Sequence, residues 1–293
     1  MKVVITIPAY NEEKTIADVI SGIRQVMSKT KYSYKLLLVD DGSTDRTAEI
    51  AEKAGAIVFR NQTNKGLART FGVEMRECLK LNADIIVHTD ADGQYLAKDI
   101  PSLIKEVEAG NDIVLGSRFK GKIEEMSFLK TVGNKAFSKV ISSITRTKIS
   151  DAQTGFRAFT NEVAKSINIV SDFTYTQEQI IKAARMNFKI KEIPVYFAKR
   201  KDKSRLIKHP FEYALKAWIN LFRIYRDYKP LKFFGIFGGT FFLAGFAIGL
   251  FILYTFFTKG FVGALPRVML SVLFISIGVQ IWLFGFLADM IRK

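Results

Sequence analysis

Two aspartates separated by one residue, Asp90 and Asp92, stand in the pattern Asp-Ala-Asp-Gly-Gln. Carboxylates at this spacing can hold a hard divalent cation beside a diphosphate. The same spacing also occurs where aspartates merely cap a turn. Here the pair closes the apolar segment 84–90, which is typical of a strand, and a position at a strand end favours a cation site.

A second acidic loop contains Asp40, Asp41 and Asp45 and follows the apolar segment that ends at Val39. Carboxylates at the end of a strand can accept hydrogen bonds from ribose hydroxyls or from the NH groups of a base. Alternatively, residues 43–45 cap a following helix. The two interpretations are compatible if Asp41 belongs to the site while its neighbours cap the helix.

The elements that must position these carboxylates alternate along the chain. Strands are predicted at 2–7, 36–41, 84–90 and 112–117, with helices at roughly 13–28, 44–54, 66–80 and 97–109. Alternation of this kind predicts an α/β fold with a mainly parallel sheet. Polar residues follow each of the four strands, and ligands bind such sheets at the carboxyl ends of the strands. We therefore expect one shared site at that edge.

Six short motifs together resemble the family 2 glycosyltransferases of the GT-A fold, a Rossmann-like architecture. Within that family they are most similar to polyprenyl-phosphate sugar synthases of the dolichyl-phosphate mannose synthase type. The motifs are PAYNEE (8–13), DDGSTD (40–45), NKG (64–66), DADGQ (90–94), GSR (116–118) and DAQTGFRAF (151–159). The resemblance covers about residues 1–207. Processive polysaccharide synthases share the early motifs, but their Q-x-x-R-W signature is absent from this sequence.

The resemblance implies a role for each matching residue. It assigns the catalytic positions to Asp90, Asp92 and Arg118, with Asp92 and Gln94 ligating Mg²⁺ or Mn²⁺ and Asp90 positioning the donor. The nucleotide sugar would contact Pro8, Tyr10, Glu12, Asp40, Asp41, Ala91, Asp92, Gln94, Arg118 and Arg205. The acceptor phosphate would contact Arg118, Lys130, Asn134 and Arg205, although Lys130 and Asn134 depart from the basic residue and serine of related synthases. Glu178 matches an acidic position near the sugar.

Two uncharged apolar stretches, at about 233–257 and 268–288, lie near the C-terminus. Each reaches the roughly 20 apolar residues that a membrane-spanning helix needs. The short link between them predicts a transmembrane hairpin, and two buried core helices are the alternative. Two glycine pairs, Gly235/Gly239 and Gly245/Gly249, have the GxxxG spacing that permits close helix contact, although glycine is also common in membrane helices generally.

Basic residues are concentrated near the outer ends of this hairpin, whereas its link contains only Lys259 and Arg267. The positive-inside rule therefore places the catalytic domain and the C-terminus in the cytoplasm. The outer residues are Arg223, Arg226, Lys229, Lys232, Arg292 and Lys293.

The segment that precedes the hairpin has apolar residues at steps of three and four between Phe211 and Tyr225. This pattern predicts an amphipathic helix at 210–228, lying either in the membrane interface or on the catalytic domain. The expected organisation is a catalytic domain at 1–207, an amphipathic segment at 208–230 and the hairpin at 231–293.

The chain has 293 residues and a net charge of +16. One Cys and two His argue against a disulfide framework or a structural zinc site. Part of the positive charge lies in the run Lys199–Lys208, which could bind anionic headgroups, close over substrate phosphates or be simply solvated. Because a membrane and phosphate substrates account for the charge, we do not expect a nucleic-acid partner.

These observations predict an inverting, metal-dependent transfer of a hexose from a nucleotide sugar to dolichyl or polyprenyl phosphate at the cell membrane. A phosphate monoester is already an anion at neutral pH, so the reaction needs no general base, and His88 could point away from the site. GDP-mannose is slightly favoured as donor, with UDP-glucose and UDP-N-acetylglucosamine as alternatives. A non-catalytic nucleotide-sugar-binding protein, or transfer to a protein or glycan, is the other possibility. The oligomeric state stays open.

Overall fold

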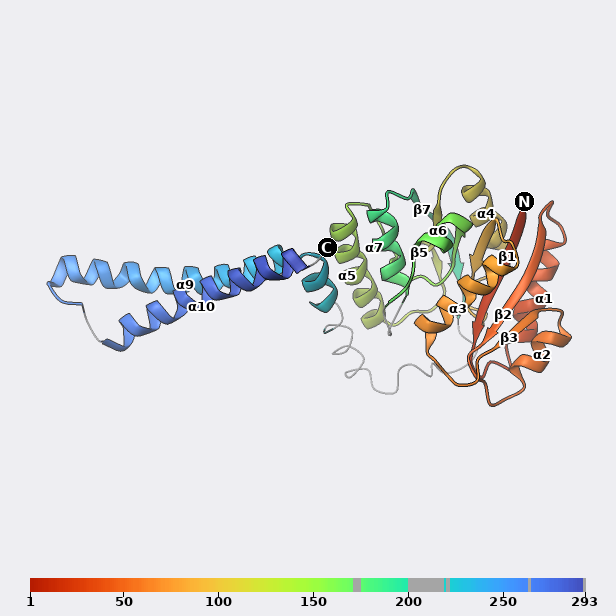
Figure 1. The fold of residues 1–293 in the computed structure, drawn as a ribbon, viewed down its shortest axis with the longest axis horizontal. Coiled ribbons are helices and arrows are strands. Elements are labelled where there is room, and N and C mark those ends of the chain that lie inside the picture. Colours follow the sequence, from red (N-terminus) through yellow and green to blue (C-terminus); the bar gives the residue numbers. More distant parts are fainter. Residues whose placement is uncertain (171–174, 200–218, 220–221, 263–264, 292–293) are drawn as a thin grey trace. The chain divides into compact units, whose positions relative to one another are not determined.

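The computed structural model describes residues 1–170, 175–199, 219, 222–262 and 265–291. The chain divides into two compact units, Met1–Pro210 and Phe211–Lys293. The first unit contains the α/β elements and the second contains the long C-terminal helices (Figure 1). Arg205 and most of the predicted helix at 210–228 lie outside the described residues, but residues 222–228 are helical.

A seven-stranded sheet forms the centre of the first unit, in the order β3-β2-β1-β4-β6-β5-β7. The strands are β1 (Lys2–Ala9), β2 (Ser33–Asp40), β3 (Ile57–Arg60), β4 (Ile85–His88), β5 (Ile113–Ile123), β6 (Arg157–Thr160) and β7 (Ile190–Phe197). Neighbouring strands are parallel except that β6 runs antiparallel to both β4 and β5. The predicted α/β fold with a mainly parallel sheet is confirmed.

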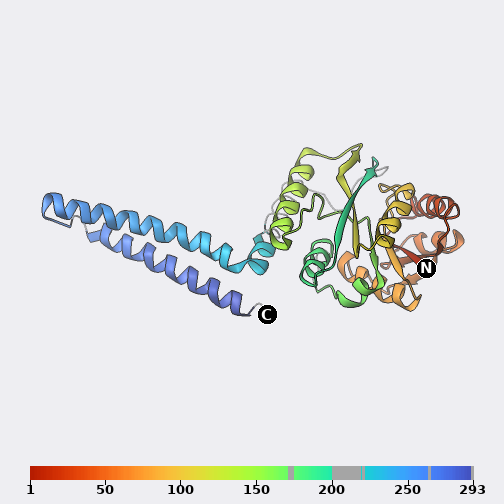
Figure 2. The ribbon, with the colours of Figure 1, turned by 90° about the horizontal axis from the view of Figure 1, so that it is seen from above.

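Helices cover both faces of this sheet (Figure 2). They are α1 (Ile16–Met27), α2 (Thr47–Lys53), α3 (Leu67–Lys80), η1 (Ala97–Asp99), α4 (Ile100–Glu108), α5 (Phe128–Thr145), α6 (Asn161–Ser166) and α7 (Thr176–Arg185). The apolar stripes of α1 and α4 pack on the same side of β1 as Ile5 and Ile7. Because side chains alternate along a strand, Thr6 points to the opposite side, where it meets α3.

The second unit contains α9 (Pro230–Lys259) and α10 (Leu265–Ile291), which are 30 and 27 residues long. Their most apolar windows have mean hydropathies of 2.2 and 2.1, so both are long and apolar enough to cross a membrane. The predicted apolar stretches 233–257 and 268–288 lie within these helices. The two helices pack against each other as a hairpin.

Glycines permit the close approach of α9 and α10. A Cβ placed on Gly245 would lie 2.8 Å from the backbone nitrogen of Ile275, and one on Gly278 would lie 2.7 Å from that of Phe242. The Ser271 hydroxyl donates to the Gly245 carbonyl oxygen at 2.8 Å. Of the two glycine pairs noted in the sequence, Gly245/Gly249 therefore faces α10, whereas a Cβ on Gly235 or Gly239 would meet no atom within 4 Å.

We predict that Gly245→Leu destabilises the hairpin by about 1–3 kcal/mol, because the new side chain overpacks the contact with α10. Gly239→Leu is the matched control on the same helix, and it should leave stability nearly unchanged because its Cβ enters open space. Thermal unfolding of the full-length chain in detergent measures both. Equal effects of the two substitutions would contradict this packing.

Candidate active site

The loops that follow β1 and β2 are joined to each other by hydrogen bonds. The Asn11 backbone NH donates to the Ser43 hydroxyl at 2.9 Å, and the Thr44 backbone NH donates to the Asn11 side-chain oxygen at 2.8 Å. The Glu12 backbone NH donates to the Thr47 hydroxyl at 2.8 Å. Asn11 has a φ of 56°, a left-handed conformation that asparagine tolerates better than most residues. The two loops therefore form one rim at the carboxyl edge of the sheet.

Of three predicted donor-binding residues, Tyr10 and Glu12 belong to this rim, and Pro8 lies at the end of β1 beside it. Tyr10 is 40% exposed, and Pro8 and Glu12 are partly exposed. The Thr15 hydroxyl donates to the Glu12 carboxylate at 3.1 Å, which orients that side chain. The rim can therefore offer an aromatic ring and a carboxylate to a ligand.

Asp40 and Asp41 act chiefly on neighbouring parts of the chain. Asp40 is fully buried, accepts from the Ser43 backbone NH at 3.0 Å and lies 3.1 Å from Arg60 Nε. Asp41 accepts from the Asn61 side chain and from the backbone NH groups of Lys65 and Gly66, each at 2.9 Å. It thereby holds the turn that begins α3. The contacts of Asp40 hold the Ser43 backbone and the Arg60 side chain in place. Asp41 is also nearly buried, with 5% of its surface exposed.

The motif at residues 90–94 follows β4 directly. Asp90, Asp92 and Gln94 are each partly exposed, Ala91 is buried, and Gly93 turns the chain with a φ of 74°. The Gln94 backbone NH donates to Asp92 Oδ1 at 3.1 Å, and the Gln94 side-chain NH₂ donates to the Ala198 carbonyl at 3.1 Å. The end of β7 therefore holds this loop in place.

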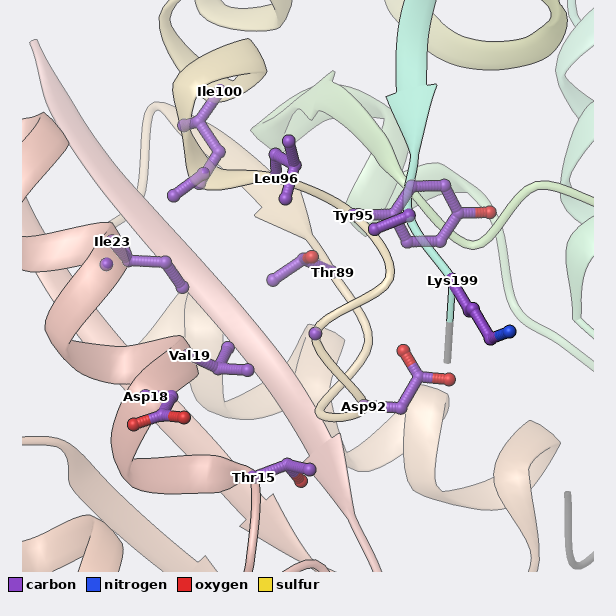
Figure 3. Close-up of a pocket in the computed structure, with 14 residues that line it drawn as sticks. Thr15, Asp18, Val19, Ile23, Thr89, Asp92, Tyr95, Leu96, Ile100 and Lys199 are labelled. Carbon is purple, nitrogen blue, oxygen red and sulfur yellow. The ribbon is translucent and has the colours of Figure 1, made fainter. Parts of the chain in front are cut away.

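A cavity of about 320 Å³ opens beside Asp92. Its walls are mostly apolar, and they include Val19 and Ile23 of α1 together with Leu96 and Ile100. Figure 3 shows Asp92 and Lys199 at one end of this cavity. Thr15, Asp18 and Thr89 add polar groups elsewhere in the lining.

Burial and repulsion from Asp92 raise the pKa of Asp90 from 3.8 to about 6, against the opposing influence of His88 and Arg118. The negative charge of Asp92 therefore adds to the effect of burial on Asp90. Oxygen donors at Asp92 and Gln94 suit Mg²⁺ or Mn²⁺, which proteins often hold with one or two carboxylates plus substrate phosphates. Among the described residues there is no cluster of three His, Cys, Asp or Glu that could bind a metal without such phosphates.

Arg118 is held by a residue to which the sequence analysis gave no role. Its Nε and one terminal nitrogen donate to Asp151 at 2.7 Å each, and its backbone NH donates to the same carboxylate at 3.0 Å. Arg118 is 8% exposed and Asp151 is fully buried. Asp151 is the first residue of the motif at 151–159. Its place in that motif is the sequence feature that could have identified it as part of the site.

Two basic residues, Arg118 and Lys135, lie near the Phe119 ring. The Arg118 guanidinium lies 5.9 Å from the ring centroid, and the Lys135 ammonium of α5 lies 5.6 Å from it. Lys130 is on the first turn of the same helix and partly exposed, whereas Asn134 is buried with its amide 3.9 Å from Met126 Sδ. The exposed Lys135 is therefore a cation that the sequence analysis missed.

Glu178 lies on the first turn of α7 and is 9% exposed. It accepts from the Val170 backbone NH at 2.9 Å and forms an ion pair with Lys182 at 2.7 Å. These contacts attach residue 170 to α7.

A mainly parallel sheet with helices on both faces, and with an Asp-x-Asp motif and a rim of polar loops at its carboxyl edge, defines a glycosyltransferase of the GT-A class. A model of the family "Glycosyl transferase family 2" matches residues 4–167, and one of the "GtrB C-terminal hairpin" matches residues 229–293. The chain belongs to glycosyl transferase family 2. The family resemblance inferred from the motifs is confirmed, and the hairpin indicates association with a membrane.

Relatives extend over nearly the whole chain. Glycosyltransferase AglJ of Haloferax volcanii is 31% identical over 99% of this chain and 93% of its own. Dolichol-phosphate mannosyltransferase of Pyrococcus furiosus is 30% identical over 97% of this chain and 81% of its own. Glucosyl-3-phosphoglycerate synthase of Mycobacterium tuberculosis, solved with Mn²⁺, uridine diphosphate and glucosyl-3-phosphoglycerate, shares the fold, with a TM-score of 0.58 and 16% identity over 75% of this chain and 79% of that one.

Replacement of Asp151 should expose the dependence of Arg118 on its partner. We predict that Asp151→Ala lowers the free energy of unfolding by about 3–5 kcal/mol, because it leaves a buried guanidinium unpaired. The double variant Arg118→Met/Asp151→Leu should recover most of that loss. Glu49→Ala breaks an exposed pair with Lys53 and should change little. Urea unfolding of the full-length chain compares the three, and a small effect of Asp151→Ala would contradict a buried pair.

Stabilisation by Mn²⁺ should depend on pH through Asp90. Because its folded-state pKa is raised, its contribution to stability is complete below the ordinary value of 3.8 and is lost as pH rises through about 6. A nearby cation compensates for that loss, so we expect the Mn²⁺-induced rise in melting temperature to be larger at pH 7.5 than at pH 5. Thermal unfolding in the presence of a nucleoside diphosphate, with and without MnCl₂, measures it. Asp90→Asn should flatten the dependence, and an equal rise at both pH values in the unmodified protein would contradict the prediction.

Proposed function

We propose that this glycosyltransferase moves a hexose from a nucleotide sugar to dolichyl or polyprenyl phosphate, with inversion at the anomeric carbon. The observation that carries the proposal is the placement of Asp90 and Asp92 at the carboxyl end of β4, in a chain that also carries the α9–α10 hairpin. The hairpin keeps the enzyme at a membrane, where a lipid phosphate resides.

The donor would lie along the rim formed by the β1 and β2 loops. Pro8, Tyr10 and Glu12 would contact the base and ribose, together with Asp41. Ala91 would line the donor site. Asp40 would support this surface through its contacts with Ser43 and Arg60 rather than touch the donor.

Asp92 and Gln94 would hold Mg²⁺ or Mn²⁺, which offsets the negative charge that builds on the departing nucleoside diphosphate. Asp90 would orient the donor sugar from the deeper side of the loop. The Gln94 NH₂ group is engaged by the Ala198 carbonyl, and this leaves the side-chain oxygen as the atom suited to the cation.

The acceptor supplies its own nucleophile. The second pKa of a phosphate monoester is about 6, so its oxygen is anionic at neutral pH and can attack without a general base. One direct displacement inverts the anomeric configuration. Arg118 and Lys130 would offset the repulsion between the two anionic substrates, together with Arg205, which lies outside the described residues. Asn134 would line the same side of the site. We add Lys135 to this group because it lies against the Phe119 ring.

The distribution of basic residues supports a cytoplasmic catalytic domain. Six lie near the outer ends of the hairpin and two lie in its link. The positive-inside rule then puts both outer ends on the cytoplasmic side. Soluble nucleotide sugars would reach the site from that compartment.

GDP-mannose is slightly favoured as the donor, in line with the name of the Pyrococcus furiosus relative. UDP-glucose and UDP-N-acetylglucosamine are the alternatives. The rim residues offer hydrogen-bonding groups to any of these nucleotides, so the test must include all three.

We predict that the full-length protein in detergent transfers label from one of these donors to polyprenyl phosphate in the presence of Mn²⁺ or Mg²⁺. Label in the organic phase measures transfer, and NMR of the product reports the anomeric configuration. Asp92→Ala should lower transfer by about 10²–10³-fold, because it removes stabilisation of the leaving group. Asp84→Ala is the matched control, because Asp84 is exposed and accepts from the Lys2 backbone NH before β4 begins.

Lipid-phase label that persists in Asp92→Ala, or that forms without a divalent cation, would contradict the proposed mechanism. Nucleotide binding without transfer from any donor would favour a non-catalytic nucleotide-sugar-binding protein. Transfer only to a protein or glycan would replace the lipid acceptor.

A further inference from the structure

A row of buried polar side chains crosses the centre of the sheet just below the catalytic edge. Thr6 on β1 pairs in register with His88 on β4, and His88 pairs with Arg157 on β6. All three are fully buried. Polar groups in such a place require partners, and the row occupies positions that an apolar core could have filled.

Glu74 of α3 covers one end of this row. It is fully buried, accepts from the Thr6 hydroxyl at 2.8 Å and has Oε2 3.4 Å from His88 Nε2. Its other oxygen, Oε1, has no hydrogen-bond partner among the residues that the structure describes. Burial by itself would lower the pKa of His88. The attraction and hydrogen bond to Glu74, together with the charge of Asp90, outweigh burial and the opposing charge of Arg157, so the pKa of His88 is raised.

His88 also fixes the segment before β6. Its Nδ1 lies 2.8 Å from the Gly155 carbonyl oxygen, which can only accept, so Nδ1 donates the proton. Arg157 donates to the carbonyl oxygen of the adjacent Thr154 and to the Gln179 side chain. Tyr175 closes the cluster, with its hydroxyl 3.3 Å from both ring nitrogens of His88 and its ring stacked on Phe71.

The other side of the same segment faces the site. A Cβ placed on Gly155 would lie 2.9 Å from Asp90 Oδ1, so the Cα of Gly155 packs directly against the Asp90 carboxylate. Four residues earlier, Asp151 holds Arg118. One segment therefore sets the position of both Asp90 and Arg118.

We propose that His88, held by Glu74, is a positioning residue for the transfer reaction: it anchors the Gly155 carbonyl and thereby fixes the wall against which Asp90 is set. The inference rests on the proposed function for its kinetic consequence. His88 itself does not touch substrate, because it is buried beneath the motif. Its effect is on the geometry of Asp90, and a displacement of about 1 Å in a reacting group can reduce the rate by about 10²-fold.

The test compares His88→Leu with His88→Asn in the full-length protein. The leucine variant loses the donor to Gly155, whereas the asparagine variant can present an amide NH₂ near the position of Nδ1. We expect His88→Leu to lower kcat by about 10²-fold with little change in the donor KM, and His88→Asn to recover most of that loss. Tyr175→Phe removes a contact to His88 but keeps the bond to Gly155, so its kcat should stay near that of the unmodified protein.

Two further readouts separate positioning from a general structural role. Stabilisation by Mn²⁺ with a nucleoside diphosphate should persist in His88→Leu, since the rim loops are unaffected. A crystal structure of His88→Leu should show Gly155 and Asp90 displaced. Unchanged kcat per folded molecule, equal losses in the leucine and asparagine variants, or an undisplaced Asp90 would overturn the proposal.

Failure of the proposed function can be distinguished from failure of the positioning role of His88. If the unmodified protein transfers no sugar from any donor, the reaction assignment fails. The displacement of Gly155 and Asp90 in the crystal structure of His88→Leu then tests the positioning role without any activity measurement.

Discussion

The ion pair between Asp151 and Arg118 is the contact on which the catalytic edge depends. It joins β5, where Arg118 lies, to the segment that leads into β6, and both partners are nearly or fully buried. Neither charge is tolerable in that environment without the other. The pair therefore fixes the path of residues 151–155, and Gly155 on that path packs against Asp90. A contact remote in sequence thus sets the geometry of the motif after β4.

The site must bring together two anionic substrates, yet its most prominent side chains are carboxylates. Burial and the charge of Asp92 raise the pKa of Asp90, so negative charge is disfavoured there even in the protein alone. In the proposed mechanism a divalent cation and basic residues would offset this negative charge. Outside the catalytic unit, close packing of α9 and α10 on glycines forms a hairpin suited to hold such an enzyme at a lipid surface.

Sequence reasoning located β1, β2, β4 and β5 because each contains a continuous buried apolar run. It did not identify β3, where no residue is buried, β6, whose four residues begin with Arg157 and end with Thr160, or β7, where buried and exposed positions are mixed. Pairing with neighbouring strands defines these elements more than their own composition does. The same limit applies to Asp40, because its ion pair with Arg60 could not be read from its place after an apolar run.

The sequence by itself determined the fold class, the family, the Asp-x-Asp motif and the two long apolar helices, because each depends on local composition or spacing. Only the tertiary structure decided which buried polar residues pair with one another. Asp151, Glu74 and His88 are far apart in the sequence, and their partners are set by strand order and helix packing. Burial makes those partners obligatory, since a charged or polar group inside the protein must find its counterpart there.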